Sequence, residues 1–411
     1  MRAVVAQETV VTRSPSLFRV LLPCLLAVSP AMAQVPLPAL PPTTLPGTPV
    51  EDTVRNARNA ADAALGTLND YARRIDTLRR REGRRVDVTP AGDAMRRGEY
   101  LAIDASADGL ARARVAGFTI VRHDADDIAP SIAQLRDTRN RTPARGLRAL
   151  RDAMPDATID FHHLYLPAGE EAASASAGAP NATPTLHVGL VDGGVDAAHP
   201  ALSRIKVHRH GCDGRAVPQR HGTQVAGRLV AGATGDLFAA DLWCGARAGG
   251  DTLGVIDALR WMARERVPVV NLSLVGPDNA ALKRTVEAFA SRGVLLVAAA
   301  GNDGPAAPPR YPAAYPSVIA VGALDARRHP LPESAAGPHL DFCADGVASR
   351  DARGTSFAAP IVAHALARHV AAIGATQALR MLEREAVDVA APGRDPRCGV
   401  GAIASPAAPV P

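Results

Sequence analysis

The sequence predicts an α/β protein in which a doubly wound parallel sheet follows a smaller α+β unit. From residue 186 onward, apolar runs of strand length such as "LHVGLVD" and "GVLLVAAAG" alternate with helical patterns. This alternation is typical of a parallel sheet that is covered by helices on both faces. Between residues 98 and 167, strand and helix patterns follow the order βαββαβ, which predicts a ferredoxin-like sheet.

Length and composition fit more than one folded unit. The chain has 411 residues, of which 47% are hydrophobic, so it can bury a large core. The net charge is +5, but arginines gather between Arg73 and Arg97. No aromatic interleaving or recognisable binding motif accompanies these arginines, so we expect no nucleic-acid partner.

Residues 1–33 have the pattern of a Sec-type signal peptide. Arg13 and Arg19 precede the apolar run "VLLPCLLAVSP", and the small residues "AMA" precede Gln34. This predicts cleavage after Ala33. The run is too short to span a bilayer, and no later stretch approaches the ~20 apolar residues of a membrane helix. We therefore expect a secreted or periplasmic protein with no transmembrane segment in the mature chain.

The cysteines agree with export. Cys24 leaves with the signal peptide, and four others remain: Cys212, Cys244, Cys343 and Cys398. Their spacing matches no CxxC or Cys/His ligand motif, so disulfides are favoured over a zinc site. The pairings that we expect are Cys212 with Cys244 and Cys343 with Cys398.

The segments between the signal peptide and the small unit are a linker and a helix. Residues 34–50 are rich in proline and should be extended. Residues 51–97 are predicted as a basic amphipathic helix, because apolar side chains recur at spacings of three and four from Val54 to Leu78. The apolar stripe is rich in alanine, which favours a helix lying on a neighbouring domain over a stable coiled coil.

Local signals support the elements of the small unit, residues 98–167. Gly117 should end its first helix, and Thr142 should cap the second, with Pro143 in the first turn. His162 and His163 are adjacent in the last strand. Neighbouring strand residues point to opposite faces, so we expect packing rather than a shared metal site.

Two connecting segments flank the larger unit, residues 186–405. Residues 168–185 are rich in alanine, serine and glycine, which predicts a linker open to proteolysis. Residues 406–411 form a short tail. Within the larger unit, Asp251 and Asp278 are the expected caps of two helices.

Polar residues stand where strands of the larger unit end or helices begin. Asp192 closes "LVD", Asn302 follows "LLVAAAG", His221 lies in "RHGTQVAG", and Ser356 lies in "GTSFAAP". Functional groups gather at the carboxyl ends of parallel strands. Together the four supply a nucleophile, a general base, a carboxylate that orients the base, and an oxyanion donor. This set predicts acyl-transfer chemistry.

These residues and the phrases around them resemble the subtilisin-like serine proteases. The phrases are "DGGVDAAHP", "HGTQVAG", "VVNLSL", "AAAGNDG", "YPAAYPSVIAVGA" and "GTSFAAPIVAHALA". The resemblance covers about residues 185–405. It implies a serine endopeptidase that hydrolyses protein or peptide substrates, with Ser356 as nucleophile, His221 as base, and Asp192 as its partner. Asn302 would bind the oxyanion.

The resemblance also implies a substrate-binding strand and a precursor. Ser273, Leu274, Val275 and Gly301 would contact the substrate backbone. The small unit, residues 98–167, resembles the pro-regions of the family, which act as intramolecular inhibitors until they are cleaved. We therefore expect cleavage within residues 168–185.

The sequence departs from the family at three points. Val275 stands where the family has a glycine, which narrows the pocket for the residue before the cleaved bond. Ala344–Gly346 reads Ala-Asp-Gly in place of Ala-Pro-Gly, and the loop that leads to Gly354 is short. No carboxylate cluster matches the calcium sites of the family. We expect no cofactor and leave calcium open.

Two other functions fit the sequence less well. A binding or scaffold protein could keep this fold without activity, and the intact candidate residues favour the protease. An α/β-hydrolase esterase is disfavoured because the context of Ser356 lacks the GxSxG elbow and the order Asp, His, Ser differs.

Overall fold

The structure is a computed structural model of the chain and describes residues 70–168, 184–246, 250–349 and 352–406. All of these belong to the second of two compact units, Asp52–Pro411. We refer to residues 70–168 as the N-terminal region and to residues 184–406 as the C-terminal region. The predicted signal peptide, the linker 34–50, residues 169–183 and residues 407–411 lie outside the described residues.

The C-terminal region is built on an eight-stranded sheet in the order β17-β14-β13-β12-β10-β7-β9-β8. All neighbouring strands in this sheet are parallel, and Asn271 of β10 lies opposite Leu190 of β7 and Val297 of β12. The strands are β7 (Thr185–Asp192), β8 (Ile205–His210), β9 (Thr234–Asp241), β10 (Val269–Leu272), β12 (Leu295–Ala299), β13 (Ile319–Leu324), β14 (Leu340–Asp345) and β17 (Ala402–Ile403). The doubly wound parallel sheet predicted from the sequence is confirmed.

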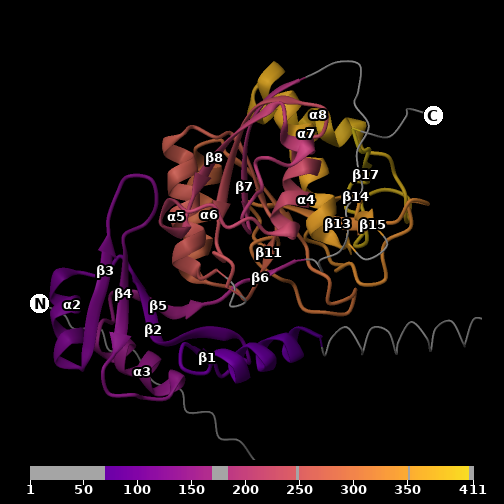
Figure 1. Ribbon diagram of the computed structural model, residues 1–411. Coiled ribbons are helices and arrows are strands. Elements are labelled where there is room, and N and C mark those ends of the chain that lie inside the picture. The colour runs from indigo at the N-terminus through magenta and orange to yellow at the C-terminus, as the bar shows by residue number, and fades with distance from the viewer. Residues whose placement is uncertain (1–69, 169–183, 247–249, 350–351, 407–411) are drawn as a thin grey trace, which may run out of the picture. The chain divides into compact units, whose positions relative to one another are not determined.

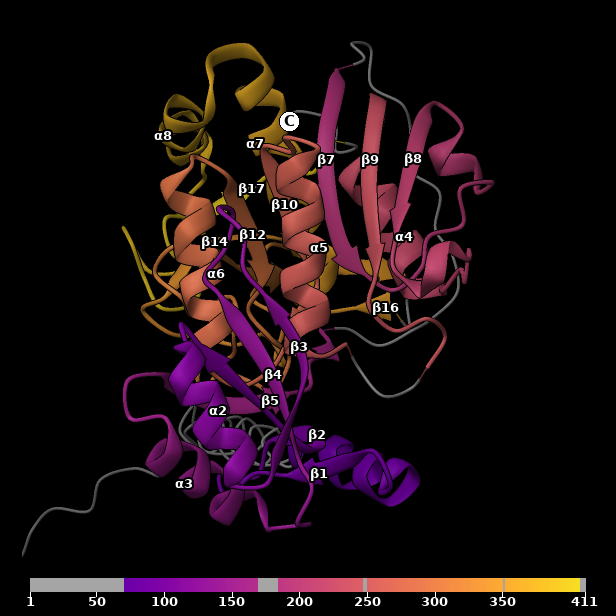
Figure 2. The ribbon, with the colours of Figure 1, turned by 90° about the vertical axis from the view of Figure 1, so that its left-hand side faces the viewer.

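Helices cover both faces of this sheet (Figures 1 and 2). Val188 and Leu190 pack in the core on the side of α4 and α7, whereas Val191 and Val270 pack on the side of α5 and α6. The helices are α4 (Arg220–Leu229), α5 (Thr252–Arg264), α6 (Ala280–Ser291), α7 (Thr355–Ile373) and α8 (Ala375–Glu385), with short 3-10 turns at Pro200–Leu202 and Cys212–Gly214. A small hairpin, β15 (Val347–Ser349) and β16 (Ala352–Arg353), precedes α7.

Helix α7 is long and apolar enough to cross a membrane by length and composition, although we expected no such stretch. The protein interior buries 67% of its apolar window. Its apolar side chains, such as Phe357, Ile361 and Val362, belong to the core of the C-terminal region. The helix is therefore accounted for as a core element.

The N-terminal region has the predicted order of strands and helices. Its elements are β2 (Ala94–Ile103), α2 (Ala107–Val115), β3 (Phe118–Asp124), β4 (Ile132–Asp137), α3 (Pro143–Ala153) and β5 (Thr158–His163). Strand β5 pairs with β2, and the sheet continues through β4 to β3, with antiparallel neighbours throughout. Tyr100, Phe118 and Phe161 centre its own small core.

The expected helix over residues 51–97 is wrong at its C-terminal end. Helical structure covers residues 70–82, and residues 51–69 lie outside the described part of the chain. After the helix, β1 (Val86–Val88) and the first residues of β2 belong to the sheet. Val86 and Val88 alternate with charged neighbours, which is a strand pattern, and Gly92 turns the chain with a positive φ of 93°.

The apolar stripe of residues 70–82 packs on a neighbour, as expected. Tyr71, Ile75 and Leu78 are buried in one cluster with Leu164 and Leu166. The helix therefore lies against residues 164–166, near the C-terminal end of the N-terminal region.

Both expected disulfides are present. Cys212 bonds to Cys244 and Cys343 bonds to Cys398, with Cα–Cα distances of 5.2 Å and 5.0 Å. Asp241 lies close enough to Cys212 and Cys244 for the three to form a metal-ligand cluster, but both sulfurs are taken up by the disulfide. The second bond ties β14 to the segment before β17.

Candidate active site

Three of the predicted residues meet where their elements begin or end. Asp192 is the last residue of β7, His221 lies in the first turn of α4, and Ser356 lies in the first turn of α7. His221 Nδ1 is 2.8 Å from Asp192 Oδ1, and His221 Nε2 is 2.9 Å from Ser356 Oγ. All three side chains are buried. The strand-end pattern thus brings together side chains that are far apart in the sequence.

This arrangement fixes the roles that the imidazole can take. When His221 Nδ1–H donates to Asp192, His221 Nε2 is the acceptor for the hydroxyl proton of Ser356. The Gly193 N–H also donates to Asp192 Oδ1 at 2.5 Å. A backbone donor of this kind holds the carboxylate in position beside the ring. The geometry can therefore activate a serine as a nucleophile.

Asn302 is oriented by Thr355, a residue that the sequence analysis missed. The backbone N–H of Thr355 and its hydroxyl both donate to Asn302 Oδ1, at 2.9 and 3.1 Å. The same hydroxyl accepts the Gly301 N–H at 3.0 Å. With its oxygen held in this way, Asn302 directs its Nδ2 donor away from Thr355. In the sequence, the only indication of this role is that Thr355 directly precedes Ser356 in "GTS".

Gly354 is required for the placement of Asn302. Its φ is +133°, and a Cβ at this position would lie 2.4 Å from Asn302 Nδ2. Any side chain here would therefore displace the amide. The atoms nearest to this position all belong to the Asn302 side chain.

The end of the N-terminal region lies across these residues as an extended peptide. Strand β6 (Leu166–Pro167) pairs antiparallel with β11 (Leu274–Val275). One residue further on, the Ala168 N–H donates to Ser273 O at 3.2 Å. Asn302 Nδ2 donates to Ala168 O. Three of the expected substrate-binding residues therefore hold a segment of the protein itself.

Tyr165 fixes this peptide further upstream. Its ring is completely buried, and its hydroxyl donates to Pro277 O at 3.2 Å. Gly276 faces the ring so closely that a Cβ there would lie 2.4 Å from it. The Tyr165 N–H donates to Gly250 O at 2.8 Å. The peptide is thus held from residue 165 to residue 168.

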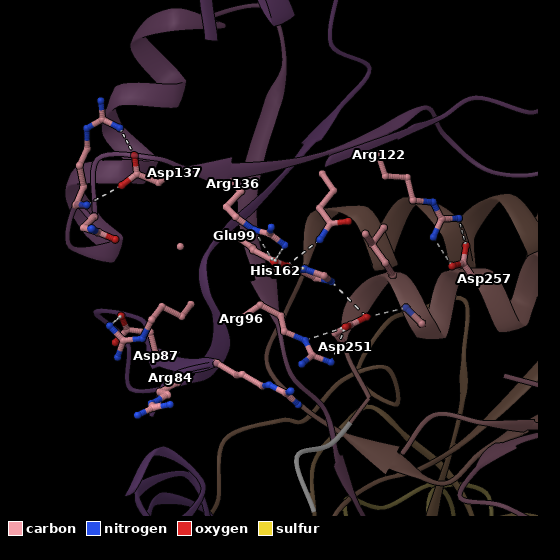
Figure 3. Close-up of a pocket in the computed structure, with 18 residues that line it drawn as sticks. Arg84, Asp87, Arg96, Glu99, Arg122, Arg136, Asp137, His162, Asp251 and Asp257 are labelled. Atoms are coloured by element: carbon pink, nitrogen blue, oxygen red, sulfur yellow. Dashed lines mark hydrogen bonds and ion pairs between the residues drawn. The ribbon is translucent and has the colours of Figure 1, made fainter. Parts of the chain in front are cut away.

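A charged cavity of about 730 Å³ lies between the N-terminal region and α5 (Figure 3). His162 reaches Glu99 Oε2 at 2.9 Å and Asp251 Oδ1 at 3.3 Å. Arg96 pairs with Asp251 at 2.8 Å. Arg122 forms two hydrogen bonds to a further carboxylate of α5, at 2.6 and 2.7 Å. The cavity wall is thus a network of ion pairs that joins the two regions.

The surroundings of the two adjacent histidines shift their pKa values in opposite directions. Burial alone would lower the pKa of His162, but hydrogen bonds and attraction from Asp251 and Glu99 outweigh it and raise that pKa. Burial lowers the pKa of His163 to about 4, and its Nδ1 contacts the Asn279 side chain at 3.0 Å. Each histidine therefore has hydrogen-bond partners of its own.

The fold and the site define an α/β protein with a Ser-His-Asp arrangement at the carboxyl ends of parallel strands. The sequence model described as the subtilase family matches residues 184–401. Subtilisin E of Bacillus subtilis is 33% identical over 208 residues, which are 44% of this chain and 54% of that protein. Subtilisin Savinase of Lederbergia lenta is 37% identical over 166 residues, or 36% of this chain and 61% of that protein. The chain belongs to the subtilase family.

A solved structure agrees on the fold. Fervidolysin of Fervidobacterium pennivorans, described as a keratinolytic enzyme related to subtilisin, aligns with a TM-score of 0.63 and 18% identity. The alignment covers 79% of this chain and 63% of fervidolysin. The likeness of fold therefore extends beyond the residues that the family match covers. The sequence match spans about half the length of subtilisin E.

Proposed function

We propose that the protein is a serine endopeptidase that acts through Asp192, His221 and Ser356, with Asn302 as an oxyanion donor. The observation that carries the proposal is the hydrogen bond from Asn302 Nδ2 to Ala168 O. The carbonyl of Ala168, held by this amide, would thus lie where negative charge develops during attack. The hydrogen-bond distances from His221 to Ser356 and to Asp192 also support the proposal, because they suit a general base that activates a serine.

The proposed reaction follows from these contacts. Ser356 Oγ attacks the carbonyl carbon of the peptide bond, and His221 Nε2 takes the hydroxyl proton. The oxyanion receives the Asn302 Nδ2–H and lies near the N-terminus of α7, whose dipole favours negative charge. His221 then returns the proton to the leaving amine, and water hydrolyses the acyl-enzyme. These steps use protein side chains and water, with no cofactor.

The protein would be made as an exported precursor that is blocked by its own chain. Ala168 donates to Ser273 and accepts from Asn302, so the bond after Ala168 is the one presented for attack. We therefore propose that maturation cuts between Ala168 and Gly169, at the start of the predicted linker. Two disulfides in the C-terminal region support an extracellular or periplasmic location.

Inhibition of the active site would involve the helix at residues 70–82 as well as the seated peptide, residues 165–168. Arg74, on the helix at residues 70–82, donates to Pro167 O at 2.8 Å. The ring of Tyr71 stacks under the guanidinium of Arg310 at 3.5 Å. This helix therefore packs over the seated peptide and would help to retain it.

The test compares the wild type with Ser356→Ala, each expressed as the full chain in a protease-deficient host. N-terminal sequencing should give a wild-type product that begins at Gly169 and a Ser356→Ala chain that keeps the N-terminal region. A fluorophosphonate probe should label the processed wild type at Ser356 and should not label His221→Ala.

Two results would contradict the proposal. Processing of Ser356→Ala at the same bond would assign maturation to another protease. Absence of labelling in a folded wild type that has lost its N-terminal region would favour the scaffold function.

A further inference from the structure

Two side chains meet beside the seated Ala168. A Cβ at Gly301 would lie 3.7 Å from Val275 Cγ1 and 3.5 Å from Arg310 Cγ. Gly301 is the residue next to Asn302, whose amide holds Ala168 O. Val275 lies on β11 directly opposite Leu166 of the seated peptide. The space next to the bound carbonyl is therefore bordered by both side chains.

With alanine at residue 168, the side chains around this space are buried. Ala168 is 1% exposed and Val275 is 3% exposed, and both belong to the same buried cluster. A larger side chain at residue 168 would have to move its neighbours, and interiors of this density resist such overpacking.

Arg310 is held in place rather than mobile. Its Nε donates to Asp303 Oδ2 at 3.1 Å, and the two side chains are 13% and 7% exposed. Its guanidinium also lies over the ring of Tyr71. Since Asp303 lies within the C-terminal region, this ion pair does not depend on the N-terminal region. The carboxylate also balances the arginine charge, so the pair offers little net attraction to an acidic or basic substrate side chain.

We propose that Val275 and Arg310 restrict the residue before the cleaved bond to small, uncharged side chains such as alanine. The substrates would thus be peptides with a small residue at that position. This proposal rests on the function proposed above. It adds Arg310 as a second specificity-determining residue beside Val275.

The first test uses the full chain and needs no catalysis. In the Ser356→Ala background, Ala168→Phe should lower the melting temperature by about 3 °C or more, because the phenyl group has no room. Ala168→Ser should leave the melting temperature within about 1 °C. Adding Val275→Gly to Ala168→Phe should recover most of the loss. Equal melting temperatures for Ala168→Phe and Ala168→Ser would overturn the proposal.

The second test measures selectivity of the processed enzyme on fluorogenic Tyr-Leu-Pro-Xaa peptides, whose first three residues match residues 165–167 of the chain. The value of kcat/KM should be about 100-fold higher for alanine than for phenylalanine or glutamate as Xaa. Val275→Gly and Arg310→Ala should each raise kcat/KM for phenylalanine by about 10-fold. Arg264→Ala, an exposed arginine of α5, is the matched control and should change neither value.

The outcomes separate the two proposals. An enzyme that is labelled at Ser356 but prefers phenylalanine or glutamate would refute the selectivity and leave the protease function standing. Loss of all labelling and hydrolysis, with the melting temperatures as expected, would refute the protease function while the restricted pocket remains.

Discussion

Replacing the hydroxyl of Thr355 should weaken catalysis without abolishing it. Thr355→Val removes the contact from Oγ1 to Asn302 Oδ1 but keeps the backbone contact at 2.9 Å. A net hydrogen bond contributes about 1 kcal/mol, and 1.4 kcal/mol corresponds to a tenfold change in rate. We therefore expect kcat to fall by about 3- to 10-fold, with KM little changed.

The same substitution should also lower stability. It leaves the Gly301 N–H without the oxygen that accepts it at 3.0 Å, and an unsatisfied buried donor costs about 1–3 kcal/mol. Steady-state kinetics on a Tyr-Leu-Pro-Ala substrate would give kcat, with the active fraction set by fluorophosphonate titration. Denaturant unfolding of the full chain in the Ser356→Ala background would give the free energy of unfolding.

Thr355→Ser is the matched control, since it keeps the hydroxyl, and its kcat should stay within about twofold of the wild type. Unchanged kcat and stability in Thr355→Val would refute the assigned role of the hydroxyl. A fall in kcat as large as that of Asn302→Ala would also refute it, because the backbone N–H of Thr355 would then contribute nothing to the orientation of the amide.

Three further predictions concern other parts of the structure. Asn302→Ala should lower kcat by about 10²- to 10³-fold with a smaller effect on KM, the loss known for the oxyanion asparagine of a subtilisin; an unchanged kcat would remove Asn302 from the mechanism. Replacing both Cys343 and Cys398 by serine should lower the free energy of unfolding by about 2–4 kcal/mol, and free thiols found by mass spectrometry in the wild type would contradict the bridge. In the Ser356→Ala background, His162 should contribute stability that is fully present below its unfolded pKa of 6.5 and is lost as pH rises through its raised folded pKa; His162→Gln should lose this dependence in pH-resolved unfolding, and identical slopes above pH 6.5 would refute it.

The parallel sheet and the catalytic candidates could be predicted because both depend on local patterns. Apolar runs marked the strands, and the carboxyl ends of parallel strands share one edge. That rule, together with the positions of His221 and Ser356 at helix starts and the resemblance to the subtilisin-like proteases, predicted that Asp192 lies beside them. Val275 was also predicted to narrow the substrate pocket, because it replaces a glycine on a strand that could be located from the sequence.

Other features depend on tertiary contacts that no local pattern encodes. Arg310 follows an irregular proline-rich segment, so its place beside Gly301 could not be read from periodicity. The cap of α6 is Asn279 rather than the expected Asp278. The side chain of Asn279 also contacts His163 of the N-terminal region, a contact that no local pattern predicts.

The ion pairs around His162 would affect what happens after the proposed cleavage. Before the proposed cleavage, residues 165–168 share a chain with the candidate active site, so dilution cannot separate them. After cleavage, the N-terminal region would be a separate molecule, retained by the pairs to Asp251 and by the packing around Tyr165. Its release would then follow mass action. A concentrated preparation would therefore remain inactive long after every chain had been cleaved. Peptidase activity would appear on dilution, on addition of salt, or when the released N-terminal region is itself digested.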